Sequence, residues 1–432
     1  MMLEVILPIV LILVILSLLN CPVYLSILAA ALYLQVFVIR MPLRNAFIGA
    51  FEGLAKVNLL AVPFFVLTGS IISSSTLGHR LMNFLMILLK RVRGGLPIAC
   101  VFANAIFGAI SGASSAAVAT FGKITYEPLR DTYGEKTALG VITASASLSN
   151  IIPPSIGLIV YGVISETPIT QLFMAGFLPG LLIVLLSCVF LLCTSRNFTS
   201  KNYTAVDSVA KKSESGELRI AFIRAVPVLL LPVVVLGSIY GGICTPTEAG
   251  AVSALYAFIF AAFIFKDIKF KSLLSLGKSS AKIVSQVFLI VSTSTVFAQA
   301  ITITQLPRYV EGLFQNVDKW LFILILNILL LIVGCFFDTS PAITVFVPLL
   351  LSTAMKLGIN PVHLGIIFIM NLGIGRFTPP FGMNIFVAQS VLKKNMKPIA
   401  MACVPYVIIY SIALFIVSYV PQIAMVLPSI LL

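Results

Sequence analysis

Apolar segments long enough to cross a lipid bilayer follow one another along almost the whole chain, and this feature constrains the fold more than any other. Pro8–Leu19, Leu172–Cys193 and Ile399–Val417 are examples that approach or reach the roughly 20 residues of a membrane-spanning helix. Of the 432 residues, 60% are hydrophobic and 10% are charged, whereas soluble proteins have roughly 25% charged residues. Because a chain inside a bilayer must satisfy its own backbone hydrogen bonds, the sequence predicts an all-α polytopic membrane protein.

The net charge of +14 comes from Lys and Arg in short loops between the apolar segments. An excess of basic residues is typical of cytoplasmic loops, and no aromatic residues are interleaved with them as a nucleic-acid surface would require. The seven cysteines form no Cys-x-x-Cys pair, and two histidines are too few for a histidine-rich metal site. We therefore expect a lipid bilayer around the chain and no nucleic-acid partner.

Two Pro-Pro pairs interrupt apolar segments, one in Ser149–Ser155 (SNIIPPS) and one in Gly375–Phe381 (GRFTPPF). Adjacent prolines end or kink a helix, and unwound backbone survives at membrane depth only where protein or a water-filled cavity surrounds it. The two breaks lie 226 residues apart, and the same shift places Phe107–Ser115 on Val333–Pro341. The sequence therefore predicts an internal duplication, each half with a re-entrant hairpin and a discontinuous helix.

Basic residues flank the two halves on opposite sides. The loop after the first break, Ser165–Thr170, contains no Lys or Arg, whereas Lys393–Lys397 after the second break contains three Lys. Lys90, Arg91 and Arg93 precede the first hairpin, whereas Lys319 beside Asp318 precedes the second. Because basic loops stay in the cytoplasm, the pattern predicts an inverted repeat.

Two amphipathic segments, Pro42–Lys56 and Ile268–Ser279, are expected to form interfacial helices. The predicted membrane topology places Arg40, Arg44 and Lys56 on the outer side of the membrane, which conflicts with the rule that basic loops stay in the cytoplasm. The predicted organisation has N-terminal scaffold helices and an interfacial arm over residues 1–56, the first inverted repeat over 57–195, a cytoplasmic loop over 196–218, scaffold helices and a second arm over 219–280, and the second inverted repeat over 281–432.

Small polar residues gather around the predicted hairpin tips and helix breaks. Half-helix N-termini present free N–H groups to an anion, and carbonyls freed by unwinding coordinate Na⁺ in transporters built this way. Gly and Ser also allow close helix packing in lipid, but two clusters related by one shift favour a binding site. The candidate substrate-binding residues are Ser114, Ser115, Asn150, Ser155, Thr339, Ser340 and Arg376.

Three charged residues have different expected roles. Asp338 is open to three: it can pair with Arg376, line an ion path or lie near the outer interface. Arg376 has two open roles, because its planar guanidinium can pair with a substrate carboxylate or can neutralise Asp338. Glu248, which follows Thr245-Pro-Thr247, is expected to cap the start of a helix.

Five stretches carry a resemblance to a known family. They are Phe107–Ala116 (FGAISGASSA), Asn150–Ile156 (NIIPPSI), Ala175–Gly180 (AGFLPG), Cys244–Ala249 (CTPTEA) and Gly375–Gly382 (GRFTPPFG), and together they span almost the full length. With them the chain resembles the large membrane (M, DctM-type) subunit of tripartite ATP-independent periplasmic (TRAP) transporters. A single Pro-Pro pair would not be specific for this family.

This resemblance implies a multi-pass subunit in the bacterial inner membrane that works as an elevator-type, Na⁺-coupled transporter. The two repeats would form a transport domain that moves against a scaffold held by a small four-helix membrane subunit (Q, DctQ-type). A periplasmic substrate-binding protein (P-type) would deliver a small organic anion, such as a C4-dicarboxylate or sialic acid.

The resemblance also implies Na⁺ sites near the hairpin tips and helix breaks. Ala113 stands where many relatives carry Ser, so only its backbone is available as a ligand. One site would use Ser111, Gly112, Ser149, Asn150 and Pro153, and the other would use Gly334, Gly375, Thr378 and Phe381, mainly through carbonyl oxygens.

Three other functional classes compete with this interpretation. A stand-alone Na⁺/dicarboxylate symporter shares the inverted-repeat logic but needs no partner subunits. An intramembrane enzyme needs convergent catalytic groups, and the sequence has no HExxH, GxSxG or paired intramembrane Asp motif. An ATP-driven permease is disfavoured because no Walker A motif is present in the chain. We therefore expect a transporter rather than an enzyme.

Overall fold

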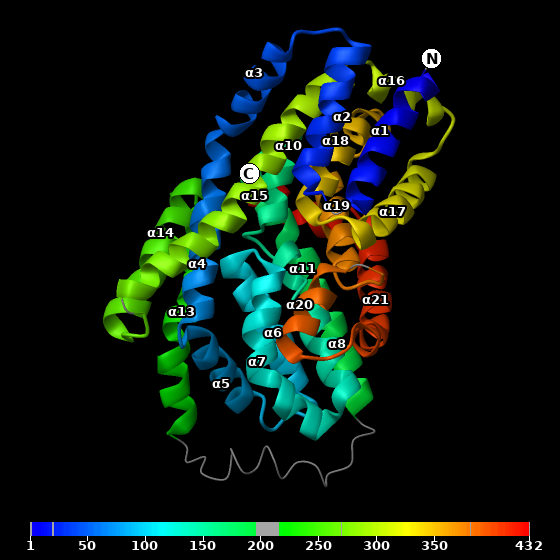
Figure 1. Ribbon diagram of the computed structural model, residues 1–432. Coiled ribbons are helices and arrows are strands. Elements are labelled where there is room, and N and C mark those ends of the chain that lie inside the picture. The colour runs from blue at the N-terminus through cyan, green and yellow to red at the C-terminus, as the bar shows by residue number, and fades with distance from the viewer. Residues whose placement is uncertain (1, 20, 196–215, 269, 381, 432) are drawn as a thin grey trace.

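The computed structural model describes residues 2–19, 21–195, 216–268, 270–380 and 382–431, and the regular elements within these ranges are helices (Figure 1). Nine helical segments of the described residues are long and apolar enough to cross a membrane. The predicted all-α polytopic architecture is confirmed. Residues 196–215 of the predicted cytoplasmic loop lie outside the described residues.

The first half contains α1 (Met2–Leu18), α2 (Val23–Tyr33), α3 (Leu43–Leu54), α4 (Ala61–Ser74), α5 (Leu77–Leu88), α6 (Gly95–Ser111), α7 (Ser114–Tyr133), α8 (Glu135–Ser145), α9 (Leu148–Ile151), α10 (Ile156–Ser165) and α11 (Ile169–Ser195). The second half contains α13 (Glu217–Tyr240), α14 (Pro246–Ile259), α15 (Phe270–Ile303), α16 (Leu306–Leu313), α17 (Lys319–Phe336), α18 (Thr339–Lys356), α19 (Pro361–Gly375), α20 (Met383–Leu392), α21 (Met396–Tyr419) and α22 (Gln422–Leu431). Glu248 completes a capping box with Thr245 at the start of α14, so its predicted capping role is confirmed.

The helix boundaries follow the predicted shift of 226 residues. A π-helical turn ends α2 at Leu34–Val38, and its counterpart follows α14 at Phe260–Ile264, which is the same place after the shift. The α6–α7 hairpin matches α17–α18, and the broken helix α8–α10 matches α19–α20. This agreement supports a duplication that extends beyond the hairpins and breaks.

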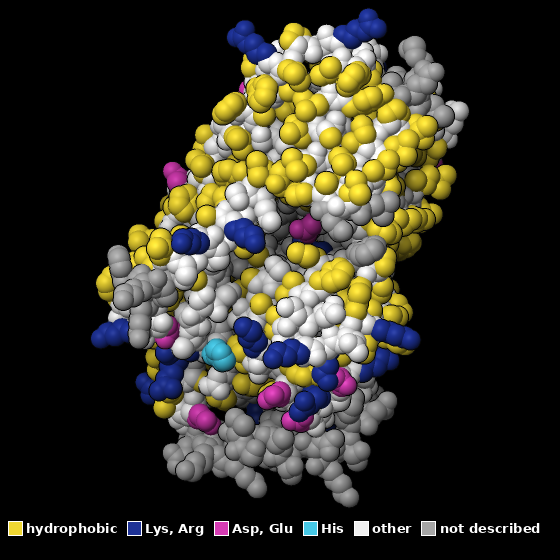
Figure 2. Space-filling model, viewed as in Figure 1, with side chains coloured by type: hydrophobic (Ala, Val, Ile, Leu, Met, Phe, Trp, Pro, Cys, Tyr) yellow, Lys and Arg dark blue, Asp and Glu magenta, His cyan; other side chains and the backbone are white. Residues whose placement is uncertain are grey.

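The two hairpins enter the molecule from opposite ends. In Figure 1, α6 and α7 lie in the lower half, α17 and α18 lie in the upper half, and their tips meet near the middle. The helix that follows each break packs on the hairpin of the other half: α10 packs on α18, and α20 packs on α7. Most charged side chains visible in Figure 2 lie in the lower half of that face, as expected for a cytoplasmic end.

The halves differ where the predicted interfacial arms lie. The helical part of Pro42–Lys56 is observed as α3, and an irregular segment around Lys56 separates it from α4. The predicted separate helix at Ile268–Ser279 is wrong, because these residues lead into the continuous 34-residue helix α15. The boundary predicted between residues 280 and 281 therefore falls inside one helix. The sequences also differ here, because Pro63 lies in the first turn of α4, where proline is tolerated, whereas its counterpart Leu289 lies inside α15.

The broken helices form the centre of the molecule. All described residues of α19 from Val362 to Gly375 are buried, and the most apolar window of Glu135–Ser165 is 94% buried. In contrast, the corresponding window of α14 and the turn after it is 33% buried. The backbone of the first break is thus surrounded by protein, which is the condition under which unwound backbone is tolerated at membrane depth, whereas Pro379 and Pro380 of the second break are exposed.

Candidate functional site

The tip of the first hairpin rests on the first Pro-Pro break. Helix α6 ends at Ser111, and Gly112 takes a left-handed conformation with φ of 58° before α7 begins at Ser114. Glycine is needed here both for this positive φ and for space, because a Cβ on Gly112 would lie 2.9 Å from the carbonyl oxygen of Pro154. The structure therefore brings together the tip and break residues of the first predicted ion site.

The first break is held by one serine. Ser155 Oγ donates to the carbonyl of Asn150 at 2.5 Å and accepts from the backbone N–H of Leu158 at 3.4 Å, so it caps α10. Ser149 Oγ is buried and has no hydrogen-bond partner within the described part of the chain. Of these two predicted site residues, Ser155 has a structural task already and Ser149 has an oxygen free to act as a ligand.

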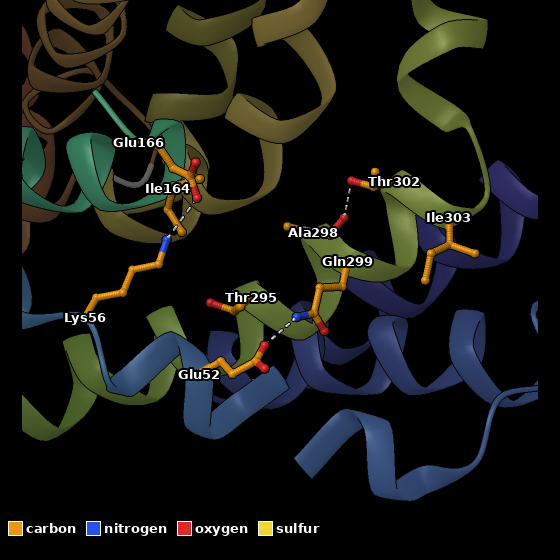
Figure 3. Close-up of a pocket in the computed structure, with 9 residues that line it drawn as sticks. All are labelled: Glu52, Lys56, Ile164, Glu166, Thr295, Ala298, Gln299, Thr302 and Ile303. Atoms are coloured by element: carbon orange, nitrogen blue, oxygen red, sulfur yellow. Dashed lines mark hydrogen bonds and ion pairs between the residues drawn. The ribbon is translucent and has the colours of Figure 1, made fainter. Parts of the chain in front are cut away.

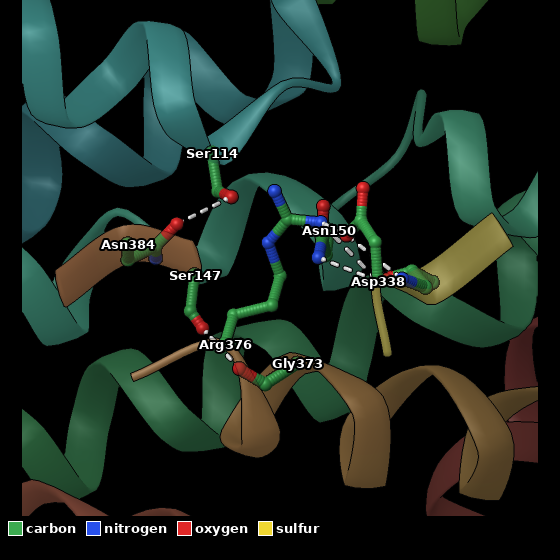
Figure 4. Close-up of polar contacts among 8 residues, drawn as sticks. Ser114, Ser147, Asn150, Asp338, Gly373, Arg376 and Asn384 are labelled. Atoms are coloured by element: carbon green, nitrogen blue, oxygen red, sulfur yellow. Dashed lines mark hydrogen bonds and ion pairs between the residues drawn. The ribbon is translucent and has the colours of Figure 1, made fainter. Parts of the chain in front are cut away.

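An ion pair lies at the tip of the second hairpin (Figure 4). Asp338 caps α18 by accepting the backbone N–H of Thr339 at 2.8 Å, and Arg376 Nη1 donates to the Asp338 carboxylate. The same nitrogen lies 3.4 Å from Thr339 Oγ1. Arg376 is 8% exposed, and its Nε is buried without a partner among the described residues. Of the two roles predicted for Arg376, the structure contains the pair with Asp338.

Backbones touch where each hairpin crosses its broken helix. A Cβ on Gly108 would lie 2.7 Å from Ser149 Cα, and a Cβ on Gly375 would lie 2.2 Å from the carbonyl carbon of Gly334. These two contacts are equivalent under the 226-residue shift. Gly334 and Gly375 of the second predicted ion site are therefore in direct contact. Thr378 lies one turn away and donates to the carbonyl of Ile374 at 2.7 Å, and Phe381 lies outside the described residues.

Side-chain hydrogen bonds join the repeats at the centre (Figure 4). Ser147 Oγ donates to the carbonyl of Gly373 at 2.8 Å, and these two residues are each other's equivalents. Asn150 donates to Thr339 Oγ1 at 3.2 Å. Ser114 donates to Asn384 Oδ1 at 2.9 Å. The predicted residues Ser114, Asn150 and Thr339 thus lie at one junction between the two hairpin tips and the two breaks.

Asn384 is a central residue that the sequence reasoning missed. Besides accepting from Ser114, its amide donates to the carbonyl of Thr143 at 3.3 Å, and its side chain is fully buried. The available signal was an Asn in the apolar run directly after the second break. The remaining predicted residues, Ser115 and Ser340, make no side-chain hydrogen bond within the described ranges and keep their hydroxyls open.

A second polar region lies between α3, α15 and the end of α10 (Figure 3). It is a cavity of about 450 Å³ lined by Glu52, Lys56, Ile164, Glu166, Thr295, Ala298, Gln299, Thr302 and Ile303. Lys56 Nζ donates to the carbonyl of Val163 at 2.7 Å and lies 3.8 Å from the Glu166 carboxylate. This contact gives Lys56 a structural role, which accounts for its conflict with the charge rule.

The sequence matches a known transporter family. The chain matches "Tripartite ATP-independent periplasmic transporter, DctM component" over residues 10–423. The chain belongs to this family. The C4-dicarboxylate TRAP transporter large permease protein DctM of Pseudomonas aeruginosa is 34% identical over 90% of each chain. The sialic acid TRAP transporter large permease protein SiaM of Vibrio cholerae is 32% identical over 88% of each chain.

The fold is also found in a more distant transporter. The crystal structure of the YdaH transporter of Alcanivorax borkumensis matches with a TM-score of 0.58 at 14% identity, over 87% of each chain. The DctM family comprises transporter permeases and not enzymes. With its apolar helices, this family member is a multi-pass protein of the inner membrane.

Proposed function

We propose that the chain is the permease subunit of a Na⁺-coupled TRAP transporter that imports a small organic anion. A periplasmic binding protein delivers the anion, a small four-helix membrane subunit holds the scaffold helices, and the two repeats move against that scaffold as an elevator. The observation that carries the proposal is the meeting of two hairpin tips with two helix breaks near the middle of the molecule. This is the arrangement in which secondary transporters place substrate and ion sites.

Four helix N-termini support an anionic substrate. Helices α7, α10, α18 and α20 all begin at a tip or a break; the bond Ser114–Asn384 joins the starts of α7 and α20, and α10 packs on α18. Each N-terminus carries a partial positive charge and unpaired N–H groups. Arg376 adds a full positive charge at the same junction. A carboxylate there would compete with Asp338 for the guanidinium and would also reach Ser114, Ser115, Ser155 and Ser340.

Four helix C-termini support a coupling cation. Helices α6, α9, α17 and α19 end at the same tips and breaks, and their last carbonyls lack helical partners. Hard cations prefer such oxygen ligands. One Na⁺ site would use Ser111, Gly112, Ser149, Asn150 and Pro153, and the other would use Gly334, Gly375, Thr378 and Phe381.

Removing single hydroxyls tests the ion sites. In proteoliposomes with an imposed Na⁺ gradient, Ser149→Ala and Thr378→Ala should each raise the half-saturating Na⁺ concentration roughly fivefold, the effect of losing about 1 kcal/mol of coordination. Ser145→Ala is the matched control, because its hydroxyl lies on the same broken helix but is bonded to Val141 and Asn104. Unchanged Na⁺ dependence in both variants, with normal insertion, would remove these residues from the sites.

The alternative is a stand-alone Na⁺/dicarboxylate symporter, and omission of partners distinguishes the two. Purified chain alone should give no gradient-driven uptake, whereas addition of the small subunit and the loaded binding protein should restore it. Uptake of free substrate by the chain alone would contradict the tripartite assignment. Uptake that requires ATP would contradict Na⁺ coupling.

A further inference from the structure

A basic cavity opens beside the first turns of α5, away from the central junction. It has a volume of about 470 Å³ and is lined by Thr76, His79, Arg80, Asn83, Ala221 and Arg224. Its lining residues come from α5 and α13. It therefore contains two guanidinium groups, an imidazole, a side-chain amide and a hydroxyl, and no lining residue is acidic.

Arg80 is held in place for recognition. Its guanidinium carbon lies 3.8 Å from the centre of the Phe265 ring, and its Nε donates to Thr76 Oγ1 at 2.9 Å. A guanidinium fixed in this way keeps its terminal N–H groups available and loses little entropy on binding. Neither these terminal nitrogens nor the Arg224 guanidinium make a hydrogen bond or ion pair within the described residues.

The nearby carboxylate, Asp267, is already satisfied. It accepts both the backbone N–H of Thr76 at 2.9 Å and the hydroxyl of Thr76 at 2.7 Å, so it sits at the start of α5. At this place the partial positive charge of the helix N-terminus offsets its negative charge. The two arginines are the charged residues that line the cavity, and neither forms an ion pair with Asp267 within the described residues.

The surroundings of the cavity are those of a membrane boundary. On α13, Ile220, Phe222 and Ile223 flank Arg224 and are 52%, 48% and 57% exposed. Helix α5, which lines the cavity, lies toward the lower end of the molecule in Figure 1, and a histidine and several basic side chains are visible in the lower half of Figure 2. This is the end that the basic loops assign to the cytoplasm.

We propose that this cavity binds the phosphate headgroup of an anionic phospholipid, with Arg80 and Arg224 on the phosphate and the exposed face of α13 along an acyl chain. A phosphate oxygen accepts well from a guanidinium fork, and His79 and Asn83 add donors for further headgroup oxygens. Basic pockets between transmembrane helices on the cytoplasmic side are suited to such headgroups. A soluble phosphate would meet the same arginines but would gain nothing from the apolar face.

Native mass spectrometry of the full-length chain in detergent tests this site. The probes are phosphatidylglycerol, cardiolipin, phosphatidylcholine and inorganic phosphate. The wild-type chain should retain the two anionic lipids in preference to phosphatidylcholine. Affinity for them should fall about fivefold for each arginine removed, in Arg224→Gln and in the double variant with Arg80→Gln.

Two features keep the experiment decisive. Arg91→Gln with Arg93→Gln is the matched control, because it removes two basic charges next to α5 but outside the cavity lining, and it should leave lipid retention unchanged. Arg224→Glu keeps the test valid if Arg80 variants fail to fold, since Arg224 is exposed and has no structural contact among the described residues. Equal lipid loss in the control pair, or phosphate binding as tight as that of the lipids, would overturn the proposal.

Discussion

The two repeats share a backbone plan but differ in chemistry at their tips. The shift of 226 residues places Gly112 of the first tip on Asp338 of the second, and Asn150 of the first break on Arg376 of the second. The first tip is accordingly neutral and built from glycine and hydroxyl groups, whereas the second contains an ion pair. Backbone features that can coordinate a cation occur twice, while the side chain suited to a carboxylate occurs once.

The two halves also differ in the helices outside the hairpins and breaks. The first half breaks between α3 and α4, and Lys56 from that break contacts the end of α10. The second half runs through the equivalent place as α15, and Lys282, the counterpart of Lys56, is exposed and has no side-chain partner within the described residues. The two halves thus make different contacts with the broken helices.

The largest expected effect comes from changing the contact between the second hairpin and its broken helix so that it resembles the equivalent contact in the first half. Gly375→Ser introduces the residue found at the equivalent position Ser149, but its Cβ would lie 2.2 Å from the backbone of Gly334. We expect a loss of roughly 3 kcal/mol of stability, the upper range for overpacking, and loss of uptake. Thermal unfolding in detergent measures the change. Gly373→Ala is the control, because its Cβ would meet side chains at ordinary contact distance, Ile151 at 3.5 Å and Ser147 Oγ at 4.0 Å; equal melting temperatures for the two variants would contradict the account.

The next effect separates the charged tip from the neutral one. Arg376→Gln should lower the ratio of maximal uptake rate to half-saturating substrate concentration by roughly a hundredfold, since it removes a charge-assisted contact. Ser114→Ala, which removes the neutral bond to Asn384, should lower it by roughly fivefold. Initial uptake rates over a range of substrate concentrations give both values.

The Asp338→Asn variant decides which role Arg376 has during transport. If Arg376 contacts the substrate, its substitution is more damaging than Asp338→Asn, and the saturation curve moves to higher substrate concentration. Identical kinetics for Asp338→Asn, Arg376→Gln and the double variant would assign Arg376 to the internal pair alone.

The smallest effect concerns the scaffold contact. Lys56→Gln removes the bond to Val163, and its ion pair with the 84% exposed side chain of Glu166 adds little. We expect the maximal uptake rate to change by roughly twofold to fivefold with an unchanged substrate requirement, as for loss of one hydrogen bond. Lys282→Gln should leave the rate unchanged. An equal change in both variants would show that the contact has no special part in transport.

Hydrophobicity and the repeat shift were enough to predict the helical membrane fold and both breaks, because prolines in an apolar run leave the backbone few alternatives. The continuity of α15 was missed, although Leu289 stands in α15 where the first half has Pro63. Asn384 was missed because its role depends on which segments meet at the junction, and a spacing along one chain does not specify this. The same holds for Arg376, because the sequence contains Asp338 as one possible partner but does not show whether a substrate carboxylate is the other.

Opposite orientation of the two halves is the central claim, and cysteine accessibility tests it directly. Glu166→Cys and Lys393→Cys, introduced into a chain whose seven native cysteines are replaced by serine, place exposed thiols after α10 and after α20. In intact cells with a permeabilised outer membrane, an impermeant maleimide should label position 166 at once and position 393 only after the inner membrane is opened. Labelling of both positions from the same side would contradict the inverted arrangement.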